Sequence, residues 1–191
     1  MKISKIMRFL LIATGMIFIR FSEVNGSSME PGMENGDILA TSVFGTVKNG
    51  QEVCIYSEEY DTVLVKRIIG IPGDHIVINN SGLYINEELL DEAYVKTEDW
   101  DKAALDLYVP EGYVYVMGDN RDGSMDSREF GCLPEENIEG SVITDITRLC
   151  GLHKTGVTII IYIFLFGPET VKIVIKFLRN GNTGETDHAS E

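Results

Sequence analysis

Two features of this sequence could together form a catalytic pair: a serine in a turn and a lysine in an apolar strand. Ser28 lies between Gly26 and Pro31, and Lys66 lies in the apolar run VLVKRII. A serine hydroxyl is a weak nucleophile until a neighbouring base takes its proton, and a neutral lysine amine can be that base. Each feature alone also has an ordinary explanation, because turns commonly contain serine beside glycine and proline, and strand lysines commonly face solvent.

A lysine must lose its charge before it can act as a base. At a pKa of about 10.4 only about one amine in 2,500 is neutral at pH 7, so the pKa must fall by about three units, at about 4 kcal/mol. Burial lowers the pKa of a lysine, and Val65, Ile68 and Ile69 are apolar neighbours that could desolvate Lys66.

A third group of polar residues follows an apolar segment near residue 117. The run GDNRDGSMDSR begins at Gly118 and ends at Arg128. Its spaced aspartates resemble a calcium loop, but its arginines bring positive charge and no EF-hand glutamate stands at the right position. Arginine and aspartate so close together favour a hydrogen-bonded ion-pair scaffold.

The elements that must position these residues are mainly β. Between Gly36 and about Arg148, short segments rich in Val, Ile and Tyr predict strands, and the run NNSG at residues 79–82 predicts a hairpin. Residues 87–107 could contain a loop or a short helix. The predicted strands are residues 51–56, 62–71, 75–79, 82–86 and 112–117.

Composition restricts the classes of partner and cofactor. A chain of 191 residues has room for one compact domain, and its net charge of −14 repels nucleic acid. The cysteines are too few for a disulfide framework and indicate no redox compartment, and the histidines lack the spacing of a zinc site. We therefore expect no nucleic acid, no metal and no cofactor. The scattered residues are Cys54, Cys132, Cys150, His75, His153 and His188.

Residues 1–22 predict a membrane anchor. Lys2, Lys5 and Arg8 precede an apolar run, which reaches the roughly 20 residues needed to span a bilayer if the flanking basic side chains extend to the interface. The lysines place the N-terminus in the cytoplasm and the rest of the chain outside. Cleavage after Gly26, as in a signal peptide, is the alternative.

A second apolar segment lies within residues 151–179. Val171, Val174 and Leu178 fall on one helical face, so the segment either lies on the membrane surface or spans it. If it spans, Lys176 and Arg179 lie inside. Residues 180–191 are polar and predict a disordered tail. The resulting division is an anchor at 1–22, a β-rich catalytic domain at 23–150, the apolar segment at 151–179 and the tail at 180–191.

Four segments, taken in order, resemble the signature boxes of type I signal peptidases in their bacterial, lysine-dependent form. They are SMEP at 28–31, GDI at 36–38, KRIIGIPGD at 66–74 and GDNRDGSMDSR at 118–128. The runs YIN at 84–86 and GCLPEENIEG at 131–140 are similar to further family segments, so the resemblance covers about residues 21–146. It implies a mainly β catalytic domain with an antiparallel sheet, of the type shared with self-cleaving repressors, and an N-terminal transmembrane helix.

The resemblance also implies an activity and residue roles. The activity is that of a serine endopeptidase, signal peptidase I, which cuts signal peptides from exported preproteins after small residues, as in Ala-x-Ala. Ser28 would be the nucleophile, Lys66 the general base, and Ser124 would orient the lysine amine. Met29 and Pro31 would contact the membrane or shape the pocket beside the cleaved bond. The ion-pair scaffold would consist of Asp126, Arg128, Asp119 and Arg67.

The sequence departs from one branch of the family at Gly26, where those members have a serine that donates to the oxyanion. The Ser28 amide is the natural first donor, and the second is not identified. Gly32 replaces a usual threonine, which affects the shape of the turn. Because few residues separate Phe21 from Ser28, we expect catalysis at the outer face of the cell membrane, with a single- or double-pass chain. Its partners would be membrane lipid and preproteins whose cleavage segment adds as a strand to the sheet.

Three alternatives remain at this point. A self-cleaving repressor would carry a DNA-binding domain and no anchor, unlike this acidic chain. An inactive membrane-anchored homologue, acting in assembly of a narrow set of surface proteins, would be expected to lose at least one of Ser28, Lys66, Ser124 and Asp126. A specialised peptidase for pilins or another narrow substrate set fits the sequence equally well.

Overall fold

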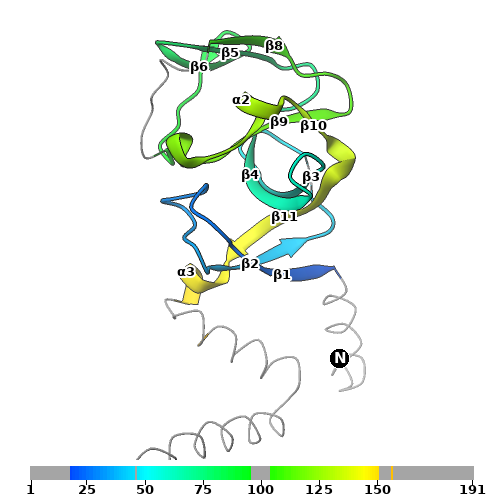
Figure 1. Cartoon of the computed structure of the whole chain (residues 1–191), viewed down its shortest axis with the longest axis vertical. Helices are drawn as coiled ribbons and strands as arrows, with labels where there is room; N and C mark the ends of the chain where they lie inside the picture. The colour runs from blue at the N-terminus through cyan, green and yellow to red at the C-terminus, as the bar shows by residue number, and fades with distance from the viewer. Residues whose placement is uncertain (1–17, 46, 96–103, 151–155, 157–191) are drawn as a thin grey trace, which may run out of the picture. The chain divides into compact units, whose positions relative to one another are not determined.

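The computed structural model describes residues 18–45, 47–95, 104–150 and 156, and these form two antiparallel sheets (Figure 1). The larger sheet has the strand order β1-β2-β11-β3-β4-β9-β10, and the smaller has the order β7-β6-β5-β8. This architecture confirms the mainly β, antiparallel prediction. The strands of the larger sheet are β1 (Ile19–Glu23), β2 (Ile38–Ser42), β3 (Glu52–Ser57), β4 (Thr62–Gly70), β9 (Tyr113–Met117), β10 (Leu133–Pro134) and β11 (Ile138–Asp145).

The smaller sheet and a few short helices complete the described part. Its strands are β5 (His75–Asn79), β6 (Gly82–Ile85), β7 (Glu88–Leu89) and β8 (Leu105–Tyr108). The helices are η2 (Arg121–Gly123), α2 (Ser127–Phe130), η3 (Glu135–Asn137) and α3 (Ile146–Cys150). The chain divides into two compact units, Met1–Leu149 and Cys150–Glu191, and both sheets lie in the first.

The five predicted strands are observed as β3, β4, β5, β6 and β9, with ends that differ by one residue at most. The predicted hairpin is also present, since Asn79 pairs with Gly82. Strands β1, β2 and β11 were not predicted. They are stabilised by pairing between distant segments, in which β2 lies between β1 and β11. In the described part of the segment 87–107, residues 90–95 form the predicted loop, and the short strands β7 and β8, which were not predicted, lie on either side of it.

The end of the predicted anchor lies in the larger sheet. Residues Ile19–Glu23 form β1 and pair with β2, so the strand begins before the predicted boundary at residue 22. Residues 1–17 lie outside the described part, as do 151–155 and 157–191, and with them most of the anchor, the second apolar segment and the tail. No helix among the described residues has both the length and the apolar character to cross a membrane.

The buried apolar side chains form three groups that fix the elements around the site. The smaller sheet packs against the end of β4 and against β9, while β3, β4 and β9 share a second group. A third group joins the segment after β1 to β2 and β11. In Figure 1 the smaller sheet lies at one end of this unit and β1 and β2 at the other, with β3, β4 and β9 between them. The third group contains Val24, Met29, Met33, Leu39 and Val142.

Candidate active site

Lys66 lies in the middle of β4 and is buried, with 2% of its surface exposed. It pairs across the sheet with Val53, and Ile68 follows it on the same face of β4; both side chains are fully buried. Val65 and Arg67 project from the opposite face, because successive side chains of a strand alternate. Ile68 therefore desolvates Lys66 as predicted, whereas Val65 faces away and the cross-strand residue Val53 takes its place.

Burial changes the charge state of the Lys66 amine. Its pKa falls from 10.5 to about 8, mainly because burial desolvates the charged form; the carboxylates of Asp126 and Asp119 oppose this fall, and the positive charge of Arg128 contributes to it. Roughly one amine in ten is then neutral at pH 7, which is several hundred times the fraction for an ordinary lysine. The strand therefore supplies an amine that can accept a proton near neutral pH.

Ser28 lies in the turns that follow β1 and is half-buried. Its carbonyl accepts a hydrogen bond from the Asn120 amide at 3.0 Å, and the Asn120 side chain donates to the Ser27 carbonyl at 3.0 Å. On the other side, Val24 exchanges backbone hydrogen bonds with Gly36 and Asp37, both at 2.8 Å. The GDI segment and the aspartate-rich loop thus hold the serine turn from two sides.

Gly118 is the point where the candidate catalytic segments meet. Continuing the register of β4 and β9 by one residue beyond their last pair places Gly118 beside Lys66. A Cβ atom at this position would lie 2.2 Å from Ser124 Oγ and 2.4 Å from the Ser28 carbonyl oxygen. Such close approach is open only to glycine, so the hydrogen side chain of Gly118 lets the serine turn, Ser124 and the lysine strand come together. No role for this glycine is evident from the sequence, although it is the first residue of the aspartate-rich run.

Asp126 and Arg128 form an ion pair on this loop. The Asp126 carboxylate is fully buried and accepts from Arg128 Nε at 2.8 Å and Nη2 at 2.9 Å. The same carboxylate accepts from the Gly118 amide at 3.0 Å, and Arg128 Nη2 also donates to the Arg121 carbonyl at 2.6 Å. The pair therefore fixes the backbone beside Lys66, in agreement with a scaffold.

Arg67 and Asp119 form a second ion pair. The Arg67 side chain projects from the face of β4 opposite to Lys66. Arg67 donates to the Asp119 carboxylate at 2.9 and 2.6 Å and to Glu52 at 2.7 Å. Burial alone would lower the pKa of the Arg67 guanidinium, but the effect of these two carboxylates is larger, and the net result is a raised pKa. Arg67, Glu52 and Asp119 line a cleft of about 610 Å³ that Pro31 also borders. The predicted scaffold thus consists of two ion pairs on two sides of the lysine strand.

Ser124 is buried, and within the part of the chain that the structure describes its hydroxyl oxygen has no hydrogen-bond partner. A buried hydroxyl without a partner is costly, typically about 1–3 kcal/mol. The Ser124 hydroxyl lies against Gly118, which is beside Lys66, so it is available to form a hydrogen bond with the lysine amine.

The residues close to Ser28 in the chain differ in how exposed their side chains are to solvent. Met29 is 1% exposed and packs in the third apolar group, so its side chain does not reach lipid as one of its two predicted roles requires; the other role, shaping the pocket beside the cleaved bond, stays a prediction. Pro31 is exposed and borders the cleft. Gly26 has a φ of 102°, a conformation that strains other residues, so a serine at this position would require a different turn.

Two further side chains, from the segment after β7, contact arginines of the site, and the sequence indicates no role for them. Glu92 pairs with Arg121, and Tyr94 lies under the guanidinium of Arg67, 4.1 Å from its ring centre. Glu92 and Arg121 are 29 positions apart, so no local pattern predicts their contact. The described residues contain no group of three or more His, Cys, Asp or Glu side chains that could hold a metal ion.

Comparison with known proteins identifies the family. A family model described as "Signal peptidase, peptidase S26" matches residues 1–146. The chain belongs to this family. As a signal peptidase it is a serine endopeptidase, and the family resemblance drawn from its motifs is confirmed.

Two relatives, from Staphylococcus aureus and Bacillus subtilis, agree with this assignment. Signal peptidase IB of Staphylococcus aureus (strain N315) is 30% identical over 153 residues, covering 70% of this chain and 80% of that protein. Signal peptidase I P of Bacillus subtilis subsp. natto is 37% identical over 131 residues, covering 61% and 71%. The crystal structure of a signal peptidase I from Enterococcus faecalis V583 is similar with a TM-score of 0.46 and 29% identity, covering 52% of this chain and 98% of that chain.

Proposed function

We propose that this signal peptidase cuts signal peptides from exported preproteins after small residues, with Ser28 as nucleophile and Lys66 as general base. The observation that carries the proposal is the buried Lys66 amine, whose pKa falls to about 8, beside the glycine against which the Ser28 turn packs. An ordinary surface lysine would stay charged and could not accept the serine proton.

The mechanism follows from these positions. The neutral amine of Lys66 takes the proton of Ser28 Oγ as this oxygen attacks the scissile carbonyl carbon. The Ser28 amide donates to the oxyanion that develops, and the lysine ammonium then passes its proton to the leaving amine. The same amine then deprotonates a water molecule as it attacks the ester carbonyl carbon, and the ammonium returns this proton to Ser28 Oγ as the acyl group leaves. The Ser124 hydroxyl accepts a hydrogen bond from the amine and so keeps its lone pair directed at the serine.

Strand β4 has a place for an extended substrate. It pairs with β3 along Thr62 to Arg67, but its pairing with β9 begins only at Arg67. On the β9 side, residues 62–66 therefore have no partner strand among the described residues. A peptide added here as a strand would run to Lys66, which supports recognition of the cleavage segment through its backbone.

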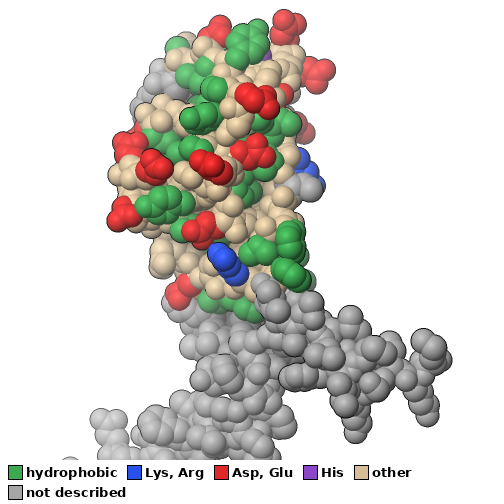
Figure 2. All heavy atoms as spheres, turned by 90° about the vertical axis from the view of Figure 1, so that its right-hand side faces the viewer, with side chains coloured by type: hydrophobic (Ala, Val, Ile, Leu, Met, Phe, Trp, Pro, Cys, Tyr) green, Lys and Arg blue, Asp and Glu red, His purple; other side chains and the backbone are tan. Residues whose placement is uncertain are grey.

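We further propose that the catalytic domain lies on the extracytoplasmic side of the cell membrane, and a group of exposed apolar side chains supports contact with a membrane. They lie in or next to the three strands at the β1 edge of the larger sheet, and the rings of Phe18 and Phe44 are 4.7 Å apart. Figure 2 shows hydrophobic side chains at the lower right of this face, with others spread among acidic side chains above them. Large exposed apolar patches commonly mark contact with lipid or protein. The residues concerned are Phe18, Ile19, Phe21, Phe44 and Ile143.

The test is cleavage of a preprotein by membranes that contain the full chain. We expect a cut after a small residue, and we expect Ser28→Ala and Lys66→Ala each to abolish it. Ser27→Ala is the matched control, because Ser27 is exposed and only its carbonyl contacts the loop. Full activity in both dyad variants would exclude the mechanism. A wild-type chain that cuts no preprotein would favour an inactive homologue in surface-protein assembly.

A further inference from the structure

A buried ion pair joins the segment after β7 to the aspartate-rich loop. Arg121 Nη1 donates to Glu92 Oε2 at 2.8 Å, and Arg121 Nη2 donates to Glu92 Oε1. Each side chain is only 2% exposed. Two charges removed so fully from water are costly, and they are tolerated only with good geometry and further hydrogen bonds. The pair therefore fixes the relative position of the two segments.

Arg121 also holds the backbone beside the candidate dyad. Its Nε donates to the Gly118 carbonyl at 3.0 Å, while the Gly118 amide donates to Asp126 at 3.0 Å. Both sides of Gly118 are thus held by charged groups. Since Gly118 packs against the Ser28 carbonyl and Ser124 Oγ, a shift of this residue would move both serines relative to Lys66.

The same segment contacts the second ion pair. The Tyr94 hydroxyl donates to Glu92 Oε1 at 2.9 Å, and the Tyr94 ring lies under the Arg67 guanidinium that binds Asp119. Residues 92–94 therefore link Arg67 and Arg121, the two arginines that hold Gly118 and Asp119.

We infer that Glu92 and Arg121 are a positioning pair for catalysis: Glu92 orients the Arg121 guanidinium, which holds the Gly118 carbonyl and thereby the geometry of Ser28, Ser124 and Lys66. The inference rests on the proposed function of that site. Neither residue touches the reacting atoms. Their effect should fall on kcat, because misplacement of about 1 Å can lower a rate about 100-fold.

The experiment compares Glu92→Met, Arg121→Met and the double variant Glu92→Met/Arg121→Met in the full chain, with kcat, KM and Tm measured for each. Removing one partner leaves a buried unpaired charge, so each single variant should lose Tm and also lose about 10- to 100-fold in kcat. Replacing both with apolar side chains removes that charge imbalance, so Tm should recover. The kcat should stay low in the double variant, because no guanidinium donates to Gly118.

A purely structural pair would give another result. In that case the double variant would recover kcat together with Tm, and the inference would be overturned. Glu92→Gln gives an independent measurement if the double variant does not fold: it keeps one acceptor oxygen for Arg121, so its kcat should lie between those of wild type and Glu92→Met. If Glu92→Gln and Glu92→Met both kept the kcat of the wild type, the inference would also be overturned.

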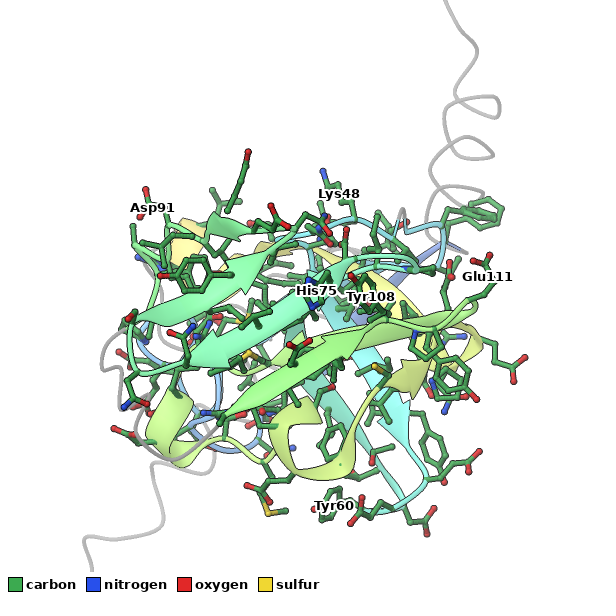
Figure 3. All side chains as sticks on the ribbon, turned by 90° about the horizontal axis from the view of Figure 1, so that it is seen from above. Lys48, Tyr60, His75, Asp91, Tyr108 and Glu111 are labelled. Carbon is green, nitrogen blue, oxygen red and sulfur yellow. The ribbon has the colours of Figure 1, made fainter. Side chains whose placement is uncertain are left out.

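Asp91→Asn is the matched control for charge. Asp91 is next to Glu92 but exposed, and Figure 3 shows it at the periphery of the molecule. Removal of the Asp91 charge in this variant should leave kcat within about twofold of wild type, because surface substitutions usually have small effects. Ser28→Ala separates the two hypotheses. Activity in Ser28→Ala would exclude the proposed function itself, whereas an inactive Ser28→Ala with a fully active double variant would exclude only the positioning role.

Discussion

Replacement of Gly118 by alanine tests the arrangement on which the candidate site depends. The new methyl group would lie 2.2 Å from Ser124 Oγ, 2.5 Å from Ser124 Cβ and 2.4 Å from the Ser28 carbonyl oxygen. Atoms in ordinary contact lie about 3.5 Å apart, so these neighbours must move by about 1 Å. Rotation of the Ser124 hydroxyl cannot relieve the clash, because the other two contacts involve Cβ and backbone.

The size of the effect follows from this displacement. Overpacking of a tight site costs about 1–3 kcal/mol of stability, which leaves most domains folded. A displacement of about 1 Å between reacting groups lowers the rate about 100-fold, equal to about 2.7 kcal/mol of transition-state stabilisation. We therefore expect Gly118→Ala to fold and to lose about 100-fold in kcat.

The assay is cleavage of a preprotein by the purified full chain, with thermal unfolding measured on the same samples. Gly32→Ala is the matched control, because a Cβ there would lie 3.5 Å from its nearest neighbour, the Met29 carbonyl oxygen. This variant should keep kcat within about twofold of wild type. Wild-type kcat in Gly118→Ala would show that the serine turn and Ser124 do not meet at this glycine, and the geometry derived above would be wrong.

Two further predictions concern the charge of Lys66. Since its pKa is about 8, kcat/KM should rise between pH 7 and 9 as the amine loses its proton, and a rate independent of pH over this range would contradict a lysine base. Because the folded pKa lies below 10.5, the unfolded chain binds more protons between pH 8 and 10.5, and stability should rise over that range. Lys66→Met should therefore stabilise the fold by up to about 3 kcal/mol at pH 7, a gain that disappears near pH 10.5 in denaturant unfolding.

Elements with local sequence signals can be predicted from the amino-acid sequence alone. Strands β3, β4, β5, β6 and β9 follow from short runs of β-branched and aromatic residues, and the β5–β6 hairpin follows from its turn residues. The order of the signature segments also identified the family and named the candidate dyad, because those residue types and spacings are read directly along the chain.

Contacts between segments far apart in the sequence become visible only in the folded chain. Strands β1, β2 and β11 are stabilised by pairing between segments far apart in the sequence, β1 with β2 and β2 with β11, and this pairing is not visible in a local pattern. Whether Lys66 faces solvent or the core depends on which face of β4 is covered. In the fold the covered face is the one with Lys66, where Ile68 and the cross-strand residue Val53 are also buried. The role of Gly118 and the pairing of Glu92 with Arg121 likewise depend on which backbones approach each other, because a residue's neighbours in space are set by packing and not by its position in the chain.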